Sequence, residues 1–462
     1  MKLVTFLATI LLSCMGLAAD FAPGDRVALI KDTPLYFSKS TMVRIGKSGE
    51  QFIVIAERRE EHKVFLSALD GGGKEIALNV ADDAVVLVEK RVIAPGATKA
   101  MEVMEGVRRD LAAGVQIPAR MVARVRGPEH QQAMLDNGGK KESEAAVVRG
   151  LKWLADNQSA DGSWAPVHQG AMTGFALLCF LGHGETPASA DYGPVVQKGI
   201  DWLLENGSKH EGRLSMSDSF DQSGVYEHGI ASYALGEYYT MTKDERAADL
   251  LKKAIGYIVQ GQGPDGGWMY AYDKTQSDTS VSGWQIQALL VAHMSGLNID
   301  GVDPALDKAM LNFKRVQAED GSFGYRKAAP GNYSLTGAGV FCTYFWKQEK
   351  DKSVREGIGF LIKQIDKEHP VTYTHETADL YAWYYNTQAC FMVGGMAWQK
   401  WNFRFQDQLI KNQKADGSWP PTSGKSPGGE IQRDPGGAGP CYRTCLCTLM
   451  LEVYYRYRPF LK

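Results

Sequence analysis

Two hydrophobic patterns alternate along the C-terminal two-thirds of the chain. Some segments carry apolar residues at three- and four-residue spacing, as at Ala247, Leu251, Ala254 and Ile258, which is typical of an amphipathic helix. Each is followed by a segment that is apolar on nearly all sides, as expected for a fully buried helix. The buried helices are predicted at residues 171–181, 225–239, 280–293, 335–346, 379–393 and 442–455. Such pairs predict an outer ring of helices around an inner ring.

A short turn sequence recurs between the two helices of a pair. It reads Gln-Ser-Ala-Asp-Gly-Ser-Trp where it ends at Trp164, and related runs end at Trp268, Phe323 and Trp419. Degenerate copies end at Leu214 and near Tyr373, so the repeat is about fifty residues long, enough for two helices and their turns. Asp, Gly and Ser suit the turn, and the aromatic residue is expected to pack between hairpins. Six hairpins predict a mainly α protein with a closed (α/α)6 toroid over residues 140–462.

These repeats resemble the QW motifs of squalene and oxidosqualene cyclases, and the β subunits of protein prenyltransferases share the six-hairpin plan. The resemblance implies the fold, but the residues that carry the chemistry of both families differ here. The Asp-x-Asp-Asp acid motif of the cyclases does not occur in this sequence. In the segments that resemble the prenyltransferase zinc site, Asp379 matches, whereas Tyr381 replaces a cysteine and Arg443 replaces a histidine. The Cys-Gly-Glu-Gln run of complement-type thioester domains is also missing, and no metal or other cofactor is expected.

The N-terminal part of the chain shows a different pattern. Short strands are predicted at 26–30, 51–55, 64–66 and 84–88, with glycine-rich turn sequences between them. Residues 22–92 therefore predict a small β-barrel, which is similar to bacterial SH3-like domains. Residues 97–139 turn polar and are expected to form a helical connector of one or two helices.

The first twenty residues have the three zones of a secretory signal. Met1 and Lys2 precede an apolar run over residues 3–17, and Ala18-Ala19-Asp20 follows. This pattern predicts a signal peptide over residues 1–19 and an extracytoplasmic protein, either periplasmic or secreted. The sequence before Cys14 imperfectly resembles a lipobox, so membrane association is expected only if Cys14 carries a lipid.

Charge and cysteine content narrow the classes of function. The formal net charge of -2 across 462 residues provides no positive potential for a polyanion, so nucleic acid is not an expected partner. Of the seven cysteines, those outside the signal are expected to be buried thiols. A disulfide or metal site at Cys441 and Cys445 is the alternative.

Polar residues near the starts of the inner helices are the expected site residues, because ligand cavities in toroids open at that end. Asp379 and Arg443 are predicted to form an ion pair in place of the metal, and Asp278 is a further catalytic candidate. The predicted ligand-binding residues are Glu227, His228, Trp284, Tyr333, Tyr381 and Tyr384. A metal held by His375, Asp379 and His228 is an alternative to this metal-free site.

Three functions agree with these residues, and the sequence does not decide whether the protein is an enzyme. The preferred one is binding of an apolar lipid or isoprenoid, or of a cell-envelope polymer. The second is a terpene cyclase-like enzyme in which Asp379 or Asp278 acts as a single acid. The third is a glycan-active lyase or hydrolase, in which Tyr226 or His228 transfers a proton and Arg443 binds a carboxylate.

Overall fold

The computed structural model describes the strands between Arg26 and Glu89 and then most of the chain from Ile117 onward. The described C-terminal ranges are 117–216, 221–346, 350–365, 367–424, 432–434 and 437–457. The chain forms two compact units, Met1–Glu102 and Val103–Lys462. The predicted signal peptide and Cys14 lie outside the described residues.

The N-terminal unit contains a seven-stranded sheet in the order β3-β2-β6-β5-β4-β1-β7, and its neighbouring strands pair antiparallel. All four predicted strand segments fall within or overlap these strands. The similarity to SH3-like domains stays a prediction. The strands are β1 (Arg26–Leu29), β2 (Thr33–Ser38), β3 (Thr41–Gly46), β4 (Gln51–Glu60), β5 (Lys63–Leu69), β6 (Glu75–Ala81) and β7 (Val85–Glu89).

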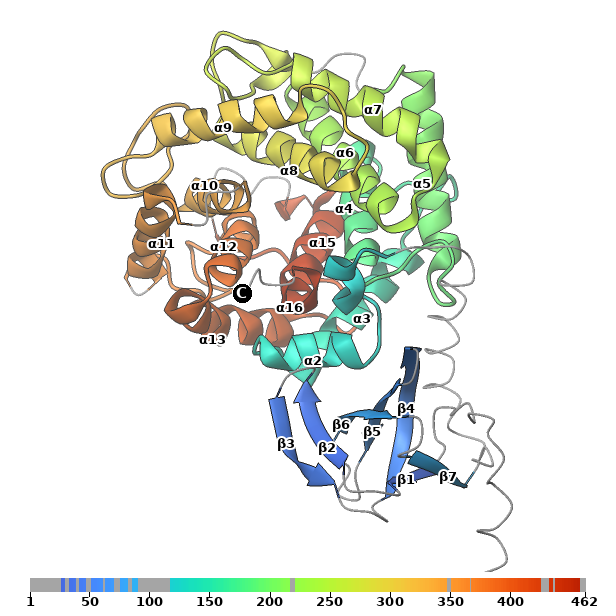
Figure 1. Ribbon diagram of the computed structural model, residues 1–462. Helices are drawn as coiled ribbons and strands as arrows, with labels where there is room; N and C mark the ends of the chain where they lie inside the picture. Colours follow the sequence, from blue (N-terminus) through green and yellow to red (C-terminus); the bar gives the residue numbers. More distant parts are fainter. Residues whose placement is uncertain are drawn as a thin grey trace, which may run out of the picture. The chain divides into compact units, whose positions relative to one another are not determined.

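The second unit is the predicted toroid, with inner helices enclosed by outer helices (Figure 1). Among the described residues, the outer ring consists of α3 (Lys141–Asp156), α5 (Gly193–Lys209), α7 (Glu245–Gln260), α9 (Val302–Val316), α11 (Lys352–Ile365) and α13 (Gly395–Asn412). The inner ring consists of α4 (Gln169–Gly182), α6 (Gln222–Thr242), α8 (Thr279–Ser295), α10 (Tyr333–Phe345), α12 (Leu380–Val393) and α15 (Gly439–Leu451). Each inner helix contacts the next one, and α15 contacts α4, so the ring is closed.

The repeated turn has the structural role that its residue types predict. Asp161 Oδ1 accepts hydrogen bonds from the backbone and hydroxyl of Ser163, at 3.0 and 2.7 Å. Gly162 adopts a φ of +96°, a conformation that glycine tolerates without a steric penalty. The buried Trp164 ring donates from Nε1 to the Leu154 carbonyl, 2.8 Å away, at the end of the preceding outer helix. The turn therefore joins the two helices of one hairpin.

The glutamine that begins each turn joins one hairpin to the next. Gln158 Nε2 donates to the Gly162 carbonyl in its own turn and to the Val195 carbonyl of α5, both at 3.0 Å. The same pair of bonds recurs at Gln262, which reaches Ala305 of α9, and at Gln317, which reaches Ser353 of α11. The repeats are thus tied together by side chain to backbone bonds as well as by apolar burial.

The same contact closes the ring between the sixth hairpin and the first. Gln413 Nε2 donates to the Gly417 carbonyl at 2.9 Å and to the Ala146 carbonyl of α3 at 2.8 Å. Arg149 of α3 donates in return to Gln413 Oε1, with bonds of 2.6 and 2.9 Å. We call this contact between α13 and α3 the closing seam.

The connector helices belong to the toroid unit. A short 3-10 helix, η2 (Ala119–Arg124), and α2 (Pro128–Asp136) both pack against α16 (Val453–Arg456), the last described helix of the chain. All six described cysteines are free thiols in buried positions, as predicted, and Cys441 and Cys445 have sulfur atoms 3.9 Å apart without a disulfide. Within the described part of the chain, no helix combines the length and apolar character needed to cross a lipid bilayer.

Candidate functional site

A cavity of about 750 Å³ opens where the inner helices begin, which is the end that the sequence predicts. Its walls come from the N-terminal two or three turns of α4, α6, α8, α12 and α15 and from the segments before them. The side chains that line it are Val167, His168, Ala171, Met172, Phe175, Asp221, Ser223, Tyr226, Glu227, Ile230, Ser280, Trp284, Tyr381, Asp434, Ala438 and Tyr442.

Aromatic rings form the deep part of the cavity. Phe175 meets Trp284 edge to face, with ring centroids 5.1 Å apart, and meets Tyr442 at 5.7 Å. Tyr384 stacks on Trp284 at 5.7 Å, so the Trp284 ring is fixed by contacts on more than one side. Such a surface gains free energy when an apolar or aromatic group covers it, since that group leaves water.

A row of hydroxyl groups crosses one wall of the cavity. Tyr226 of α6 donates to the Ser280 hydroxyl of α8 at 2.8 Å, and Ser280 lies 2.6 Å from the Tyr381 hydroxyl of α12. Burial raises the pKa of both tyrosines well above its ordinary value, so both phenols stay protonated. The row offers neutral hydrogen-bonding groups and adds no charge to the cavity.

Glu227 is a fixed carboxylate beside the cavity mouth. Its Oε2 accepts hydrogen bonds from the backbone of Gly170 at 3.1 Å and of Met216 at 3.3 Å. Its Oε1 lies 3.7 Å from Nδ1 of His168, whose side chain is 41% exposed. The contact with Glu227 raises the pKa of His168, because the carboxylate favours the charged imidazole. A carboxylate next to an exposed imidazole is suited to binding a polar group or to moving a proton.

The backbone of His168 is held in the left-handed region, with a φ of 52°. This conformation costs a non-glycine residue about 1–3 kcal/mol and tends to occur where a side chain must be aimed. His168 is also the residue directly before α4, so its conformation sets where the inner helix begins. The strain supports a functional role for this mouth.

The remaining charged residues of the cavity are acidic. Asp221 precedes α6 and accepts the Gly224 amide at 2.8 Å, and Asp434 accepts the Gly437 amide at 3.0 Å. Among the described lining residues there is no lysine or arginine. Among these described residues, the mouth therefore carries three carboxylates and one histidine.

Three of the predicted ligand-binding residues line the cavity, namely Glu227, Trp284 and Tyr381. Tyr384 lies behind the Trp284 ring. The other two, His228 and Tyr333, are buried and do not line the cavity. His228 is fully buried between the Leu214 amide and the Ala254 carbonyl, at 3.0 and 2.9 Å. Tyr333 stacks on His369, with centroids 4.1 Å apart.

The acidic catalytic candidates are helix caps. Asp278 Oδ1 accepts the amides of Ser280 and Val281 at the start of α8, at 2.7 and 3.1 Å. Asp379 Oδ1 likewise caps α12, and its Oδ2 accepts the Ser334 hydroxyl at 2.8 Å. Neither lines the cavity described here.

The predicted ion pair between Asp379 and Arg443 is wrong. Both residues are described, and Asp379 instead uses its oxygens as a cap. Arg443 donates to the carbonyls of Trp419 and Gln432, the first at 2.8 Å. The arginine therefore fastens the segment after the last repeated turn to α15. The alternative metal site also fails, because both ring nitrogens of His228 have backbone partners.

The sequence interpretation missed His168, Asp221, Asp434 and Tyr442. The first three lie just before inner helices, in segments that carry no repeated motif. Their position near a helix start was the available signal.

Comparisons with known proteins agree with this fold. Residues 143–337 match the model of a family described as a domain of unknown function (DUF6288). A probable squalene–hopene cyclase from Sinorhizobium fredii (strain NBRC 101917 / NGR234) is 22% identical over 227 residues, or 44% of this chain. That match spans only 33% of the relative's length.

Solved structures give the same result. The GH76A α-1,6-mannanase from Salegentibacter sp. HEL1_6 aligns with a TM-score of 0.50 and 12% identity, over 68% of this chain and 99% of that one. A type II terpene cyclase from Scytonema, in complex with merosterolic acid A, aligns with a TM-score of 0.46 and 11% identity, over 67% and 96%. The match to the mannanase shows that the helical unit shares the α/α toroid fold with that structure.

Proposed function

We propose that this protein is an exported toroid that binds an uncharged lipid of the isoprenoid type in its inner cavity. One observation carries the proposal: an aromatic interior is combined with a mouth whose described lining residues include carboxylates and no basic side chain. The interior favours an apolar chain. Glu227 and the row of hydroxyls at Tyr226, Ser280 and Tyr381 would hold a hydroxyl head group.

The acidic mouth argues against an anionic ligand such as a prenyl diphosphate. A unit charge within about 8 Å of one carboxylate is repelled by about 2 kcal/mol at the effective dielectric constant of a protein surface. That energy corresponds to a loss of affinity of roughly thirtyfold. A neutral prenyl alcohol avoids this repulsion and keeps the apolar contacts.

Native mass spectrometry with chosen probes tests the proposal. Geranylgeraniol should bind one to one, and geranylgeranyl diphosphate should bind at least about tenfold more weakly. The variant Ala171→Trp fills the cavity from α4 and should abolish binding. Leu311→Trp adds the same ring at an exposed position on α9 and should leave binding unchanged. Equal or tighter binding of the diphosphate, or normal binding by the Ala171→Trp variant, would refute the proposal.

A second function, glycan hydrolysis or lyase chemistry, is favoured by the pairing of Glu227 with a strained His168. Further carboxylates, Asp221 and Asp434, line the same mouth. A neutral mannotriose serves as the binding probe, and oligosaccharide mixtures serve as substrates. If mannotriose binds and geranylgeraniol does not, the second function replaces the first. Turnover should then vanish in Glu227→Gln and persist in Glu205→Gln, an exposed glutamate on α5.

Export is part of the proposal and has a separate test. The apolar run over residues 3–17 and the Ala-Ala pair before Asp20 support cleavage after Ala19. Intact-mass measurement of protein recovered from the periplasm or medium should give a chain that begins at Asp20. A lipid-modified Cys14 at the N-terminus would replace secretion by membrane anchoring, and an unprocessed cytoplasmic chain would contradict export altogether.

A further inference from the structure

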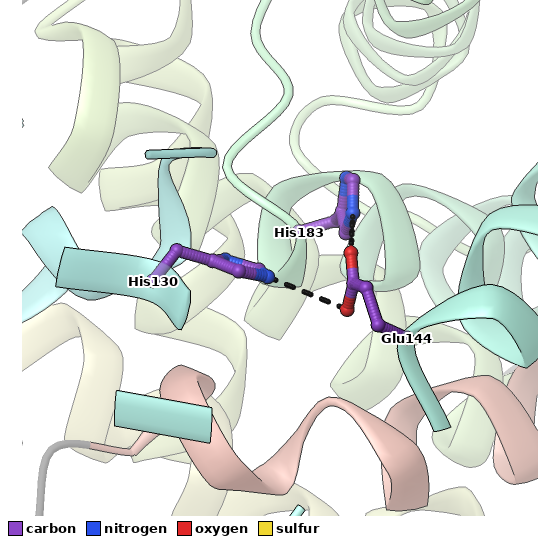
Figure 2. A group of neighbouring side chains, drawn as sticks. All are labelled: His130, Glu144 and His183. Carbon is purple, nitrogen blue, oxygen red and sulfur yellow. Dashed lines mark hydrogen bonds and ion pairs between the residues drawn. The ribbon is translucent and has the colours of Figure 1, made fainter. Parts of the chain in front are cut away.

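Two histidines and a glutamate from different elements point toward one another (Figure 2). His183 lies at the end of α4 that is opposite to the cavity mouth. His130 lies on α2, Glu144 lies on α3, and His183 directly follows α4. The ligand atoms all lie within 4.8 Å of one another. His168 and His183 flank opposite ends of α4, which is about 21 Å long at 1.5 Å per residue. The cluster is therefore distinct from the lipid-binding site proposed above.

The outer nitrogen of each histidine is already held by an acceptor. Nδ1 of His130 lies 3.2 Å from the Arg124 carbonyl, and Nδ1 of His183 lies 3.0 Å from Oε1 of Glu185. A carbonyl or carboxylate can only accept, so each Nδ1 carries the proton. In the neutral ring, Nε2 then has a free lone pair. This is the orientation that histidine ligands of metals adopt.

Both Nε2 atoms face the same carboxylate. His183 Nε2 lies 3.0 Å from Oε1 of Glu144, and His130 Nε2 lies 3.3 Å from Oε2. The second contact does not have hydrogen-bond geometry, so a 97% buried histidine aims a nitrogen into the cluster without a hydrogen-bond partner among the described residues. Lone pairs that face a carboxylate repel it unless a proton or a metal ion lies between them.

We propose that His130, Glu144 and His183 bind a divalent transition-metal ion of the zinc class. Two imidazoles and a carboxylate are a ligand set that zinc uses, at about 2.0–2.2 Å from each donor atom. The two histidine nitrogens contact different oxygens of Glu144, at 3.0 and 3.3 Å, and the three donor atoms lie within 4.8 Å of one another. Small side-chain movements would therefore bring them to the edges of about 3.3 Å of a zinc tetrahedron. The Glu144 side chain is 23% exposed, which leaves a side open for entry of the ion and for a water as fourth ligand.

The ion would fasten the connector to the first hairpin. α2 precedes the toroid ring, and the metal would tie it to α3 and to the end of α4. Tyr455 already packs on the His130 ring, with centroids 3.9 Å apart, which limits rotation of that ligand. Loss of the metal should therefore loosen α2 and leave the cavity intact. The competing explanation is a metal-free cluster in which protons on the histidines neutralise the carboxylates.

Titration of the chelator-treated full-length protein with Co²⁺ and Zn²⁺ decides between a metal site and a metal-free cluster. The wild type should bind one ion, and Co²⁺ should give the intense visible absorption of a tetrahedral site. Glu144→Gln and His183→Gln should each weaken binding by at least about 100-fold. Glu142→Gln, an exposed change on the same helix, should bind like the wild type.

Circular dichroism of each variant checks that it is folded, and thermal melting provides a second readout. Zn²⁺ should raise the melting temperature of the wild type and of Glu142→Gln but not of the ligand variants. A folded wild type that binds neither ion, or ligand variants that bind as well as the wild type, would overturn the proposal. Neither result depends on whether a lipid occupies the cavity.

Discussion

The closing seam gives a quantitative test of how the toroid holds together. Gln413→Ala removes two hydrogen bonds, of 2.8 and 2.9 Å, that the side-chain amide donates to backbone carbonyls of two different hairpins. Each such bond contributes about 1 kcal/mol net, and a carbonyl left buried without a donor adds to the cost. We expect the free energy of unfolding to fall by about 2–3 kcal/mol. The bonds from the exposed Arg149 add little, because that guanidinium can return to water.

Urea unfolding followed by fluorescence and near-ultraviolet circular dichroism measures this change. Gln262→Ala removes the equivalent bonds inside the ring, at 2.9 and 2.8 Å, and should cost the same amount. Gln197→Ala on α5, where an exposed amide contacts only Asp201 among its described hydrogen-bond partners, should change stability by less than about 0.5 kcal/mol. If Gln262→Ala costs 2–3 kcal/mol and Gln413→Ala behaves like Gln197→Ala, the ring is not closed by this contact in solution.

Three further results are expected. Gly266→Ala should lower the free energy of unfolding by more than about 2 kcal/mol, because Gly266 has a φ of +89° and an added methyl would collide with the Lys308 carbonyl. Gly256→Ala in α7 is the control, since its methyl meets open space. It should be neutral or stabilising by up to about 1 kcal/mol in the same unfolding assay. Burial lowers the pKa of His228 to about 4, whereas a histidine in the unfolded chain has a pKa of about 6.5. The unfolded chain therefore binds more protons below pH 6.5, and the free energy of unfolding should fall by about 2 kcal/mol between pH 8 and pH 5. This part of the loss should be missing in a folded His228→Gln variant. The six buried cysteines should resist a thiol reagent in the native protein and react after denaturation; fast labelling of the native state would contradict their burial.

The fold could be predicted from the sequence because its determinants are local and repeated. The Asp161-Gly162 turn needs only its own residues, and Trp164 reaches back ten positions to the helix before it. Each copy supplies the same information again, so a degenerate copy such as the one at Leu214 does not hide the pattern. Ring closure follows once six such hairpins are counted.

The site was predicted less well because consecutive residues of a helix point about 100° apart. Glu227 lines the cavity, whereas His228 beside it is sealed in the wall. Asp379 was correctly placed at the start of an inner helix, but a capping role for its carboxylate could not be distinguished from a catalytic one. The cluster of His130, Glu144 and His183 has no sequence spacing that indicates a metal, since its members come from the connector, an outer helix and an inner helix.

The closing seam also bears on how freely the chain order of this ring can be changed. Because the contact between the last hairpin and the first repeats the contacts between consecutive hairpins, ring geometry does not single out one hairpin as the first. A circular permutant opened between α8 and α9, with residue 457 joined by a linker to the start of α3, would keep its Gln-mediated seams. In such a molecule the hairpins would be synthesised in a different order, while their order around the ring would stay the same. A comparison with the natural chain would therefore distinguish the effect of chain order on folding from the effect of the final geometry.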